Sequence, residues 1–222
     1  MGKAVLNLSG VKKRGFTLIE LLVVVTIIGL LAGLAVPAVS KALQKANEAK
    51  SASNLRQIGI GLNGFASEND NVYPLAGGNI PYNASPADGE ELAWSQQLED
   101  YLGKDKSVFK NPKVKTMQYG YFIGSRGAQV AAGGGDFAAL NRLRVTQPTK
   151  HILGGECLYW QSSVDDADPD DYGENHPSFE RVDGTVQSQK TQVLFVDGHV
   201  ETLDRFDRNQ VTTRYEGVGQ DY

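Results

Sequence analysis

The sequence predicts an α+β fold in which one long N-terminal helix packs against a C-terminal antiparallel β-sheet. Residues 16–36 form an apolar run, and apolar residues at spacings of three and four continue it to Phe65. Such spacing is typical of an amphipathic helix. Near the C-terminus, Asp197-Gly198 lies between two segments in which apolar and polar residues alternate. That pattern indicates a β-hairpin.

The apolar run is long enough to cross a membrane. Between Phe16 and Val36, Glu20 is the only charged residue among 21, and a helix of this length spans about 31 Å. Three basic residues at positions 12–14 precede the run, and the next one is Lys41. Because positive charge favours the cytoplasmic side, we expect a cytoplasmic N-terminus and an extracytoplasmic C-terminal domain.

Glu20 makes this segment more specific than a plain anchor. A carboxylate in a spanning helix costs about 2.5–3.5 kcal/mol on insertion scales, so such residues usually have a partner. Cleavage between Gly15 and Phe16 would create an α-amino group one helical turn from Glu20. This amine can pair with Glu20 of the same chain or of an axially shifted neighbour.

These residues carry a family resemblance. The segment Lys12-Lys-Arg-Gly-Phe16-Thr-Leu-Ile-Glu20, with Pro37 as the twenty-second residue counted from Phe16, closely resembles the type IV prepilin cleavage and methylation motif. That family includes type IV pilins and the pseudopilins of type II secretion systems. The resemblance implies that prepilin peptidase removes residues 1–15 and methylates the amine of Phe16.

The same resemblance implies a pilin-like organisation and a non-enzymatic role. We expect a leader at 1–15, a transmembrane and assembly helix at 16–37, its amphipathic continuation at 38–66 and an extracytoplasmic globular domain at 67–222. The chain would wait in the inner membrane as a single-pass protein and then join other pilin or pseudopilin subunits in a filament. An inner-membrane assembly platform would be a further partner.

Other interpretations of the N-terminus remain. A membrane-tethered extracytoplasmic binding protein would use the leader for sorting alone. A secretory signal peptide is disfavoured, because it would have a shorter apolar region and a small-residue cleavage site, which residues 32–35 match poorly.

Inside the helix, Gly29 and Gly33 form a Gly-x-x-x-Gly pair suited to close helix contact. Pro37 opposes the carbonyl of Gly33, so we expect a kink or local unwinding there.

The remaining elements follow from turn residues and local alternation. The long helix is expected to end within residues 64–71, where Gly, Ser, Asn and Asp cluster. A second helix is predicted over residues 90–102, with Gly103 as its C-cap. Strands are predicted at residues 117–123 and 151–160. The hairpin of residues 191–203 is expected to turn through a two-residue type I′ turn at Asp197-Gly198.

The C-terminal region also resembles a processing-associated domain described by His, nine residues and Asp-Gly. Asp197-Gly198 and the following His199-Val200 match, but Gln187 stands where that histidine is expected. A role tied to that histidine is therefore not carried over. We interpret Asp197-Gly198 first as turn chemistry.

Residues able to support catalysis are present without a catalytic arrangement. His151, His176, His199, Glu156 and the single cysteine Cys157 lack a nucleophile elbow, zinc-ligand spacing or a phosphate-binding loop around them. We expect no enzymatic activity and no cofactor. Cys157 excludes an intrachain disulfide and is expected to be a small buried apolar residue.

An acidic segment offers a weaker metal hypothesis. Its carboxylates are oxygen ligands, which Ca²⁺ prefers. The segment nevertheless fails the EF-hand template, because Asp171 stands where the turn glycine belongs and Pro177 stands where the bidentate glutamate belongs. A solvated acidic loop is the favoured interpretation. The calcium candidates are Asp166, Asp168, Asp170, Asp171 and Glu174.

The net charge argues against nucleic-acid binding. Removal of residues 1–15 takes away four of the 22 basic residues and none of the 26 acidic ones, so the formal charge falls from −4 to −8. Binding to a phosphate backbone requires a surface rich in Lys and Arg. We therefore expect protein and membrane partners for this chain.

Overall fold

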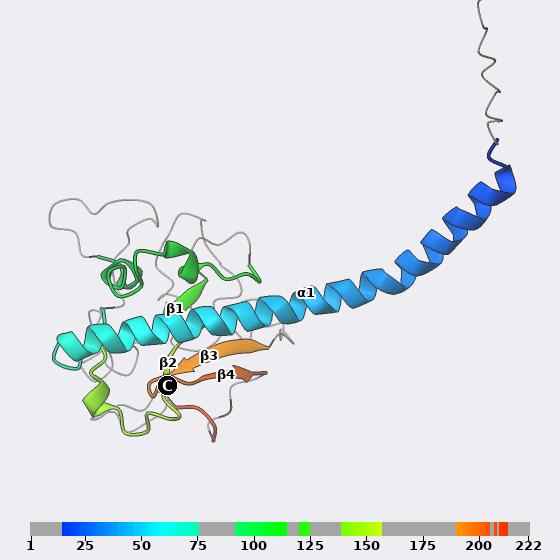
Figure 1. Ribbon diagram of the computed structural model, residues 1–222. Coiled ribbons are helices and arrows are strands. Elements are labelled where there is room, and N and C mark those ends of the chain that lie inside the picture. The colour runs from blue at the N-terminus through cyan, green and yellow to red at the C-terminus, as the bar shows by residue number, and fades with distance from the viewer. Residues whose placement is uncertain are drawn as a thin grey trace, which may run out of the picture. The chain divides into compact units, whose positions relative to one another are not determined.

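The computed structural model describes residues 15–75, 92–114, 120–124, 139–156, 190–204, 207 and 209–212. It confirms the predicted α+β class, a long N-terminal helix followed by an antiparallel sheet (Figure 1). The chain divides into two compact units, Met1–Gln44 and Lys45–Tyr222. The elements in chain order are α1 (Leu18–Glu68), α2 (Trp94–Gln97), η1 (Lys106–Phe109), β1 (Tyr121–Ile123), η2 (Arg142–Arg144), β2 (Ile152–Glu156), β3 (Thr191–Phe195) and β4 (Val200–Leu203), where η marks a 3₁₀-helix.

Helix α1 is 51 residues long and belongs to both units. It continues through Pro37 and ends at Glu68, within the predicted range. Asp70 and Asn71 then adopt positive φ angles of 52° and 65°, and the Asn71 N–H donates to the carbonyl of Ala66 at 2.8 Å. This left-handed turn satisfies one of the carbonyls left unpaired at the helix C-terminus.

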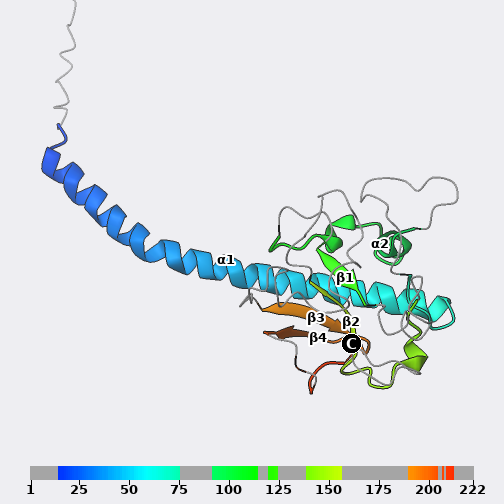
Figure 2. The ribbon, with the colours of Figure 1, turned by 180° about the vertical axis from the view of Figure 1, so that it is seen from behind.

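The sheet has four strands in the order β1-β2-β3-β4, and all neighbouring pairs are antiparallel. In both Figure 1 and Figure 2 the second half of α1 runs across this sheet. The register shifts between Ile152 and Gly154 where β2 pairs with β3. The described parts of the two predicted strands are β1 and β2, whereas residues 115–119 and 157–160 lie outside the described residues.

The hairpin of β3 and β4 is confirmed, but the predicted type I′ turn is wrong. Leu194 pairs with Val200, and the Phe195 N–H donates to the His199 carbonyl at 2.9 Å. The loop therefore has three residues, 196–198. Gly198 has a φ of 92°. Asp197 is not among the described non-glycine residues that have a positive φ, which a type I′ turn would require of it. This is a tight turn closed by a glycine in the left-handed region, the usual three-residue alternative to a two-residue loop.

The predicted helix over residues 90–102 is also wrong in length. Only α2, a single turn, is α-helical in its described part. After it, the N–H groups of Glu99 and Tyr101 donate to carbonyls three residues earlier, at 3.2 and 3.0 Å. These tighter turns bring Tyr101 and Leu102 against α1, where glycines leave room for them: ideal Cβ atoms at Gly64 and Gly61 would lie 3.0 and 3.1 Å from those side chains.

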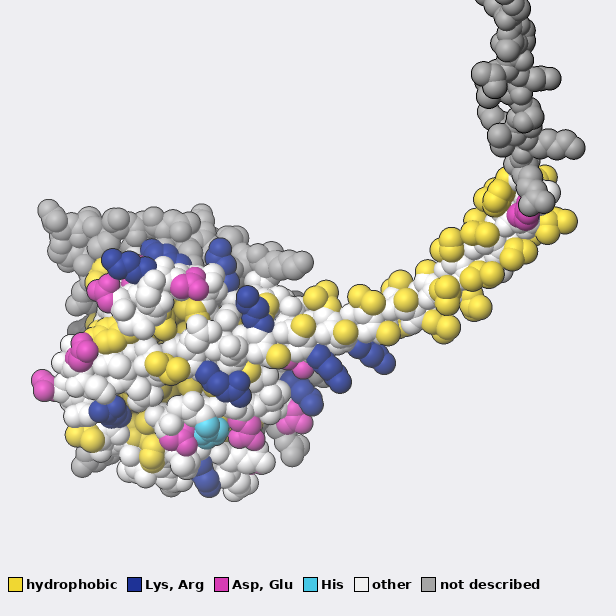
Figure 3. Space-filling model, in the orientation of Figure 1, with side chains coloured by type: hydrophobic (Ala, Val, Ile, Leu, Met, Phe, Trp, Pro, Cys, Tyr) yellow, Lys and Arg dark blue, Asp and Glu magenta, His cyan; other side chains and the backbone are white. Residues whose placement is uncertain are grey.

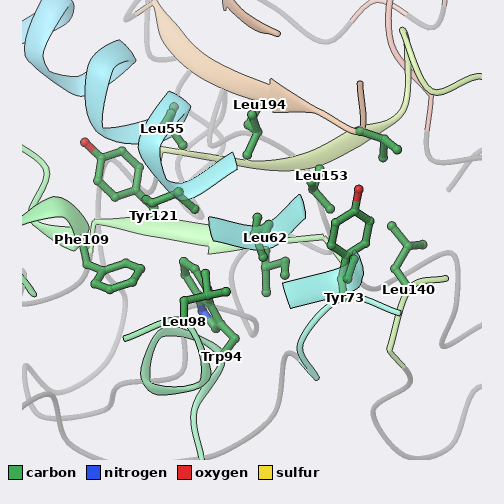
Figure 4. Packing of buried hydrophobic residues seen from close by; sticks show 14 of the residues in the cluster. Leu55, Leu62, Tyr73, Trp94, Leu98, Phe109, Tyr121, Leu140, Leu153 and Leu194 are labelled. Carbon is green, nitrogen blue, oxygen red and sulfur yellow. The ribbon is translucent and has the colours of Figure 1, made fainter. Parts of the chain in front are cut away.

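The main core lies between the second half of α1, the sheet and the segment that contains α2 and η1. Leu55 and Leu62 of α1 meet Leu153 and Leu194 of the sheet (Figure 4). Trp94 and Phe109 close this core with an edge-to-face contact at a centroid distance of 5.3 Å. A smaller cluster lies around the other sheet face: Phe122, Ile152, Val193, Phe195, Leu203 and Val211.

Two leucine-sized side chains on α1 provide a matched test of this packing. Leu55 is 1% exposed and Ile60 is 71% exposed. We expect Leu55→Ala to lower the free energy of unfolding by about 2–5 kcal/mol, because it leaves a cavity in the core. Ile60→Ala should change it by less than about 0.5 kcal/mol. Denaturant unfolding of the full chain in detergent micelles measures both, and equal effects would contradict the assigned helix face.

The raised pKa of the buried Tyr73 side chain predicts a loss of stability at alkaline pH. Its ring is 1% exposed, and burial raises the pKa of Tyr73 to about 12, while Arg142 opposes the rise. Because the folded pKa exceeds the unfolded value of about 10, this stabilisation is present below pH 10 and is lost as the pH rises to 12.

Tyr73→Phe removes this titration. We expect the free energy of unfolding of the wild-type chain to fall by about 2–3 kcal/mol more than that of the variant across this interval. Tyr121 titrates in both proteins, since burial also raises its pKa to about 12, so it cancels in the comparison. Parallel pH profiles for the two proteins would refute the prediction.

Candidate functional site

The bond between Gly15 and Phe16 lies in exposed, non-helical backbone. Residues 15–17 precede the first helical residue, Leu18. A Cβ atom at Gly15 would meet nothing within 4 Å, and Phe16 is 72% exposed. Backbone of this kind is accessible to a peptidase, whereas a bond inside the helix would first have to be unwound. The predicted cleavage position therefore lies where a peptidase can reach it.

Glu20 closes the first turn of α1 through Thr17. The backbone N–H and the hydroxyl of Thr17 both donate to Glu20 Oε2 at 2.8 Å. In return, the Glu20 N–H donates to Thr17 Oγ1 at 3.2 Å. This reciprocal pattern is a capping box, which satisfies N–H groups that have no partner inside the helix. The carboxylate also lies at the positive end of the helix dipole.

Thr17 was not among the residues predicted for this site. The signal was present in the sequence, because Thr17-x-x-Glu20 before an apolar run is the pattern of a capping box. The structure shows that Glu20 is held in a defined position by its own chain.

The apolar segment after Glu20 is exposed throughout. Every residue from Leu18 to Ala46 is exposed, and Figure 3 shows hydrophobic side chains covering the visible surface of this part of the helix. Its most apolar window meets the length and composition of a membrane-spanning helix, with none of its residues buried. Within the run, the hydroxyl of Thr26 donates to the carbonyl of Leu22 at 2.7 Å. The segment thus shields a polar group internally, as lipid requires.

The predicted assembly residues Glu20 and Pro37 lie on this exposed helix, together with the glycine pair Gly29 and Gly33. Cβ atoms at Gly29 and Gly33 would meet nothing within 4 Å, so their face is open within this chain. Pro37 lies inside the helix. The close helix contact at the two glycines, the unwinding at Pro37 and the pairing of Glu20 with a neighbour's amine all concern a second subunit, and they stay predictions.

The histidines and acidic residues that the sequence offered for catalysis or metal binding do not form a metal or catalytic site in the described part of the chain. His151 is buried, whereas His199 stacks on Phe195 at 4.2 Å and its Nδ1 lies 2.5 Å from Asp197 Oδ1. Among the described residues there is no group of three His, Cys, Asp or Glu side chains that could hold a metal. Outside the described residues lie Cys157, His176, Gln187 and the calcium candidates Asp166, Asp168, Asp170, Asp171 and Glu174.

Thr17 variants test the capping box directly. Thr17→Val removes the acceptor for the Glu20 N–H, so we expect that amide to exchange faster and the first turn of α1 to lose about 1 kcal/mol. Thr17→Ser keeps the hydroxyl and should behave as wild type. Amide hydrogen exchange of the full chain in detergent micelles resolves the difference. Unchanged protection of Glu20 in Thr17→Val would contradict the geometry.

Comparison with known proteins relates this N-terminal geometry to a described motif. Residues 11–36 match the family described as "Prokaryotic N-terminal methylation motif". The chain is 34% identical over 88 residues to the type IV major pilin protein PilA of Myxococcus xanthus (strain DK1622), which covers 36% of this chain and 40% of that protein. It is 39% identical over 66 residues to the type II secretion system core protein G of Pectobacterium carotovorum subsp. carotovorum, which covers 30% of this chain and 42% of that protein.

The chain thus spans less than half the length of either relative. No solved structure matches it. The matched motif contains Gly15, Phe16 and Glu20, so the exposed bond, the capped carboxylate and the start of the apolar segment described above belong to one known sequence motif. The N-terminal part of this chain therefore matches the prokaryotic N-terminal methylation motif at the start of a helix that is long and apolar enough to span a membrane.

Proposed function

We propose that this protein is a structural subunit, a pilin or pseudopilin, of a type IV pilus-like or type II secretion filament. The observation that carries the proposal is the placement of the methylation motif. Its Gly15–Phe16 bond is exposed, and Glu20 is the only charge between Phe16 and Val36. The similarity to a major pilin and to a secretion-system core protein supports the same assignment.

Prepilin peptidase would act first in this proposal. It cuts between Gly15 and Phe16 and methylates the new amine, which then carries a positive charge beside the lipid. Glu20 already accepts two hydrogen bonds from Thr17 at Oε2. A carboxylate has about four acceptor positions, so Glu20 retains capacity for an ammonium group. The capping box orients it for that partner.

Assembly would follow from the exposed apolar surface of α1. In the inner membrane, lipid covers this surface, with the N-terminus in the cytoplasm and the C-terminal domain outside it. On extraction, other subunits' helices must replace the lipid, and an acid–amine pair between neighbours would define their axial offset. The partners are prepilin peptidase, other subunits and an inner-membrane platform. No catalytic residue is assigned, since the proposed role is structural.

Glu20 variants in the native host test the proposal. Glu20→Ala removes the acid, so we expect the assembled fraction to fall at least about tenfold, the factor that corresponds to about 1.4 kcal/mol. Glu20→Asp keeps the charge on a shorter side chain and should assemble partly. Leu22→Ala is the control, because it trims the same exposed segment without changing its charge. Membrane insertion should be unchanged in all three.

Mass spectrometry of the native protein provides the second readout. The expected N-terminus is a methylated Phe16. Full filament assembly by Glu20→Ala, or working material with an intact Met1, would overturn the proposal. Indifference of sorting and binding to both Glu20 variants would instead support the alternative, a membrane-tethered binding protein that uses its leader for sorting.

A further inference from the structure

The globular unit contains a buried carboxylate, Glu156, at the end of β2. Its side chain is 0% exposed. Glu156 Oε2 accepts from Lys113 Nζ at 2.7 Å and from the backbone N–H of Gln192 at 2.8 Å. The hydroxyl of Ser51, on α1, donates to Oε1 of the same carboxylate. Three separate segments therefore meet at one buried anion.

Further polar groups extend this contact along α1. The hydroxyls of Ser51 and Tyr121 are 3.0 Å apart, and Asn54 Nδ2 lies 3.3 Å from the Tyr121 hydroxyl and 3.1 Å from the Lys110 carbonyl. The Lys113 ammonium also donates to the Lys190 carbonyl at 3.2 Å. We refer to these side chains as the Glu156 cluster: Ser51, Asn54, Lys113, Tyr121 and Glu156.

Apart from this cluster, α1 fits closely against its surroundings at three glycines. On α1, Gly59, Gly61 and Gly64 face Leu194, Leu102 and Tyr101 respectively. On β2, two glycines at positions 154 and 155 separate Leu153 from Glu156. Helices normally find their position because side-chain ridges enter grooves. The glycines are grooves of this kind and contribute to the position of α1, and the Glu156 cluster adds hydrogen bonds that only one helix position satisfies.

A buried ion pair is a poor source of net stability. The desolvation of both charges offsets most of their attraction, and apolar replacements of similar volume are often as stable or more so. Hydrogen bonds, in contrast, require specific distances and angles. The Glu156 cluster can therefore select one helix position even where it adds little to the free energy of unfolding.

We propose that the Glu156 cluster fixes the axial and rotational position of residues 45–68 of α1 on the sheet. A slip by one residue would rotate the helix by about 100° and move Ser51 and Asn54 away from their partners. It would also change which side chains stay at the surface, where Arg56, Gln57 and Ile60 now lie. This inference concerns the globular unit and is independent of the proposed function.

Ser51→Ala tests the cluster without leaving a charge unpaired, because Lys113 and the Gln192 N–H still bind Glu156. The control is Ser53→Ala, an exposed position on the same helix. The readout is methyl NMR of Ile58 and Leu62 in the full chain in detergent micelles, with saturation-transfer detection of minor states. We expect Ser51→Ala to raise the population of a second set of signals at least tenfold over wild type, and the control to leave it unchanged.

The double variant Lys113→Met/Glu156→Leu separates position from stability. We expect it to stay folded, with an unfolding free energy lowered by no more than about 1–3 kcal/mol, the cost of the unpaired Gln192 N–H, while the second set of methyl signals grows further. A single set of signals in both Ser51→Ala and the double variant would overturn the proposal. Unfolding of either variant would also overturn it, because the cluster would then be needed for stability and not for the choice of helix position.

Discussion

The structure depends on one helix that must satisfy two different surroundings. From Leu18 to Ala46 every residue of α1 is exposed, although most of the early side chains are apolar. From Ser51 to Ala66 the buried residues recur at spacings of one to four, and this face is covered by the sheet and the α2–η1 segment. A helix that is apolar all round requires lipid or other helices, so only the second half is completed by the chain itself.

The fold class could be predicted because its signals are local. Periodicity identified α1 and its end, and alternation identified β3 and β4, since both reflect which neighbours share a face. Details set by tertiary packing were missed. Asp197-Gly198 suits several turns, and only the pairing of Leu194 with Val200 specifies a three-residue loop. The segment after α2 has a helical pattern, but part of it forms tighter turns, and its Tyr101 and Leu102 pack where α1 carries glycines.

The candidate site shows the same difference between local sequence signals and contacts set by tertiary packing. Gly15, Phe16 and Glu20 lie within six consecutive residues, so their motif and even the capping box can be recognised without a structure. Glu156 could not be interpreted this way. Its partners Ser51 and Lys113 lie 105 and 43 residues away, and no local pattern indicates that three segments converge on it. Sequence alone presented it as one acid after two glycines in a strand.

The two carboxylates show what the chain supplies and what it leaves to a partner. Glu156 is buried, and its charge is balanced within the fold by Lys113 and by two neutral donors. Glu20 has neutral donors from Thr17 but no cationic partner within the described residues. Neutral hydrogen bonds orient a carboxylate, whereas in lipid a cation is needed to offset its charge. The proposed cleavage at Gly15–Phe16 would create such a cation one turn away, so the exposed bond and the capped acid would act together.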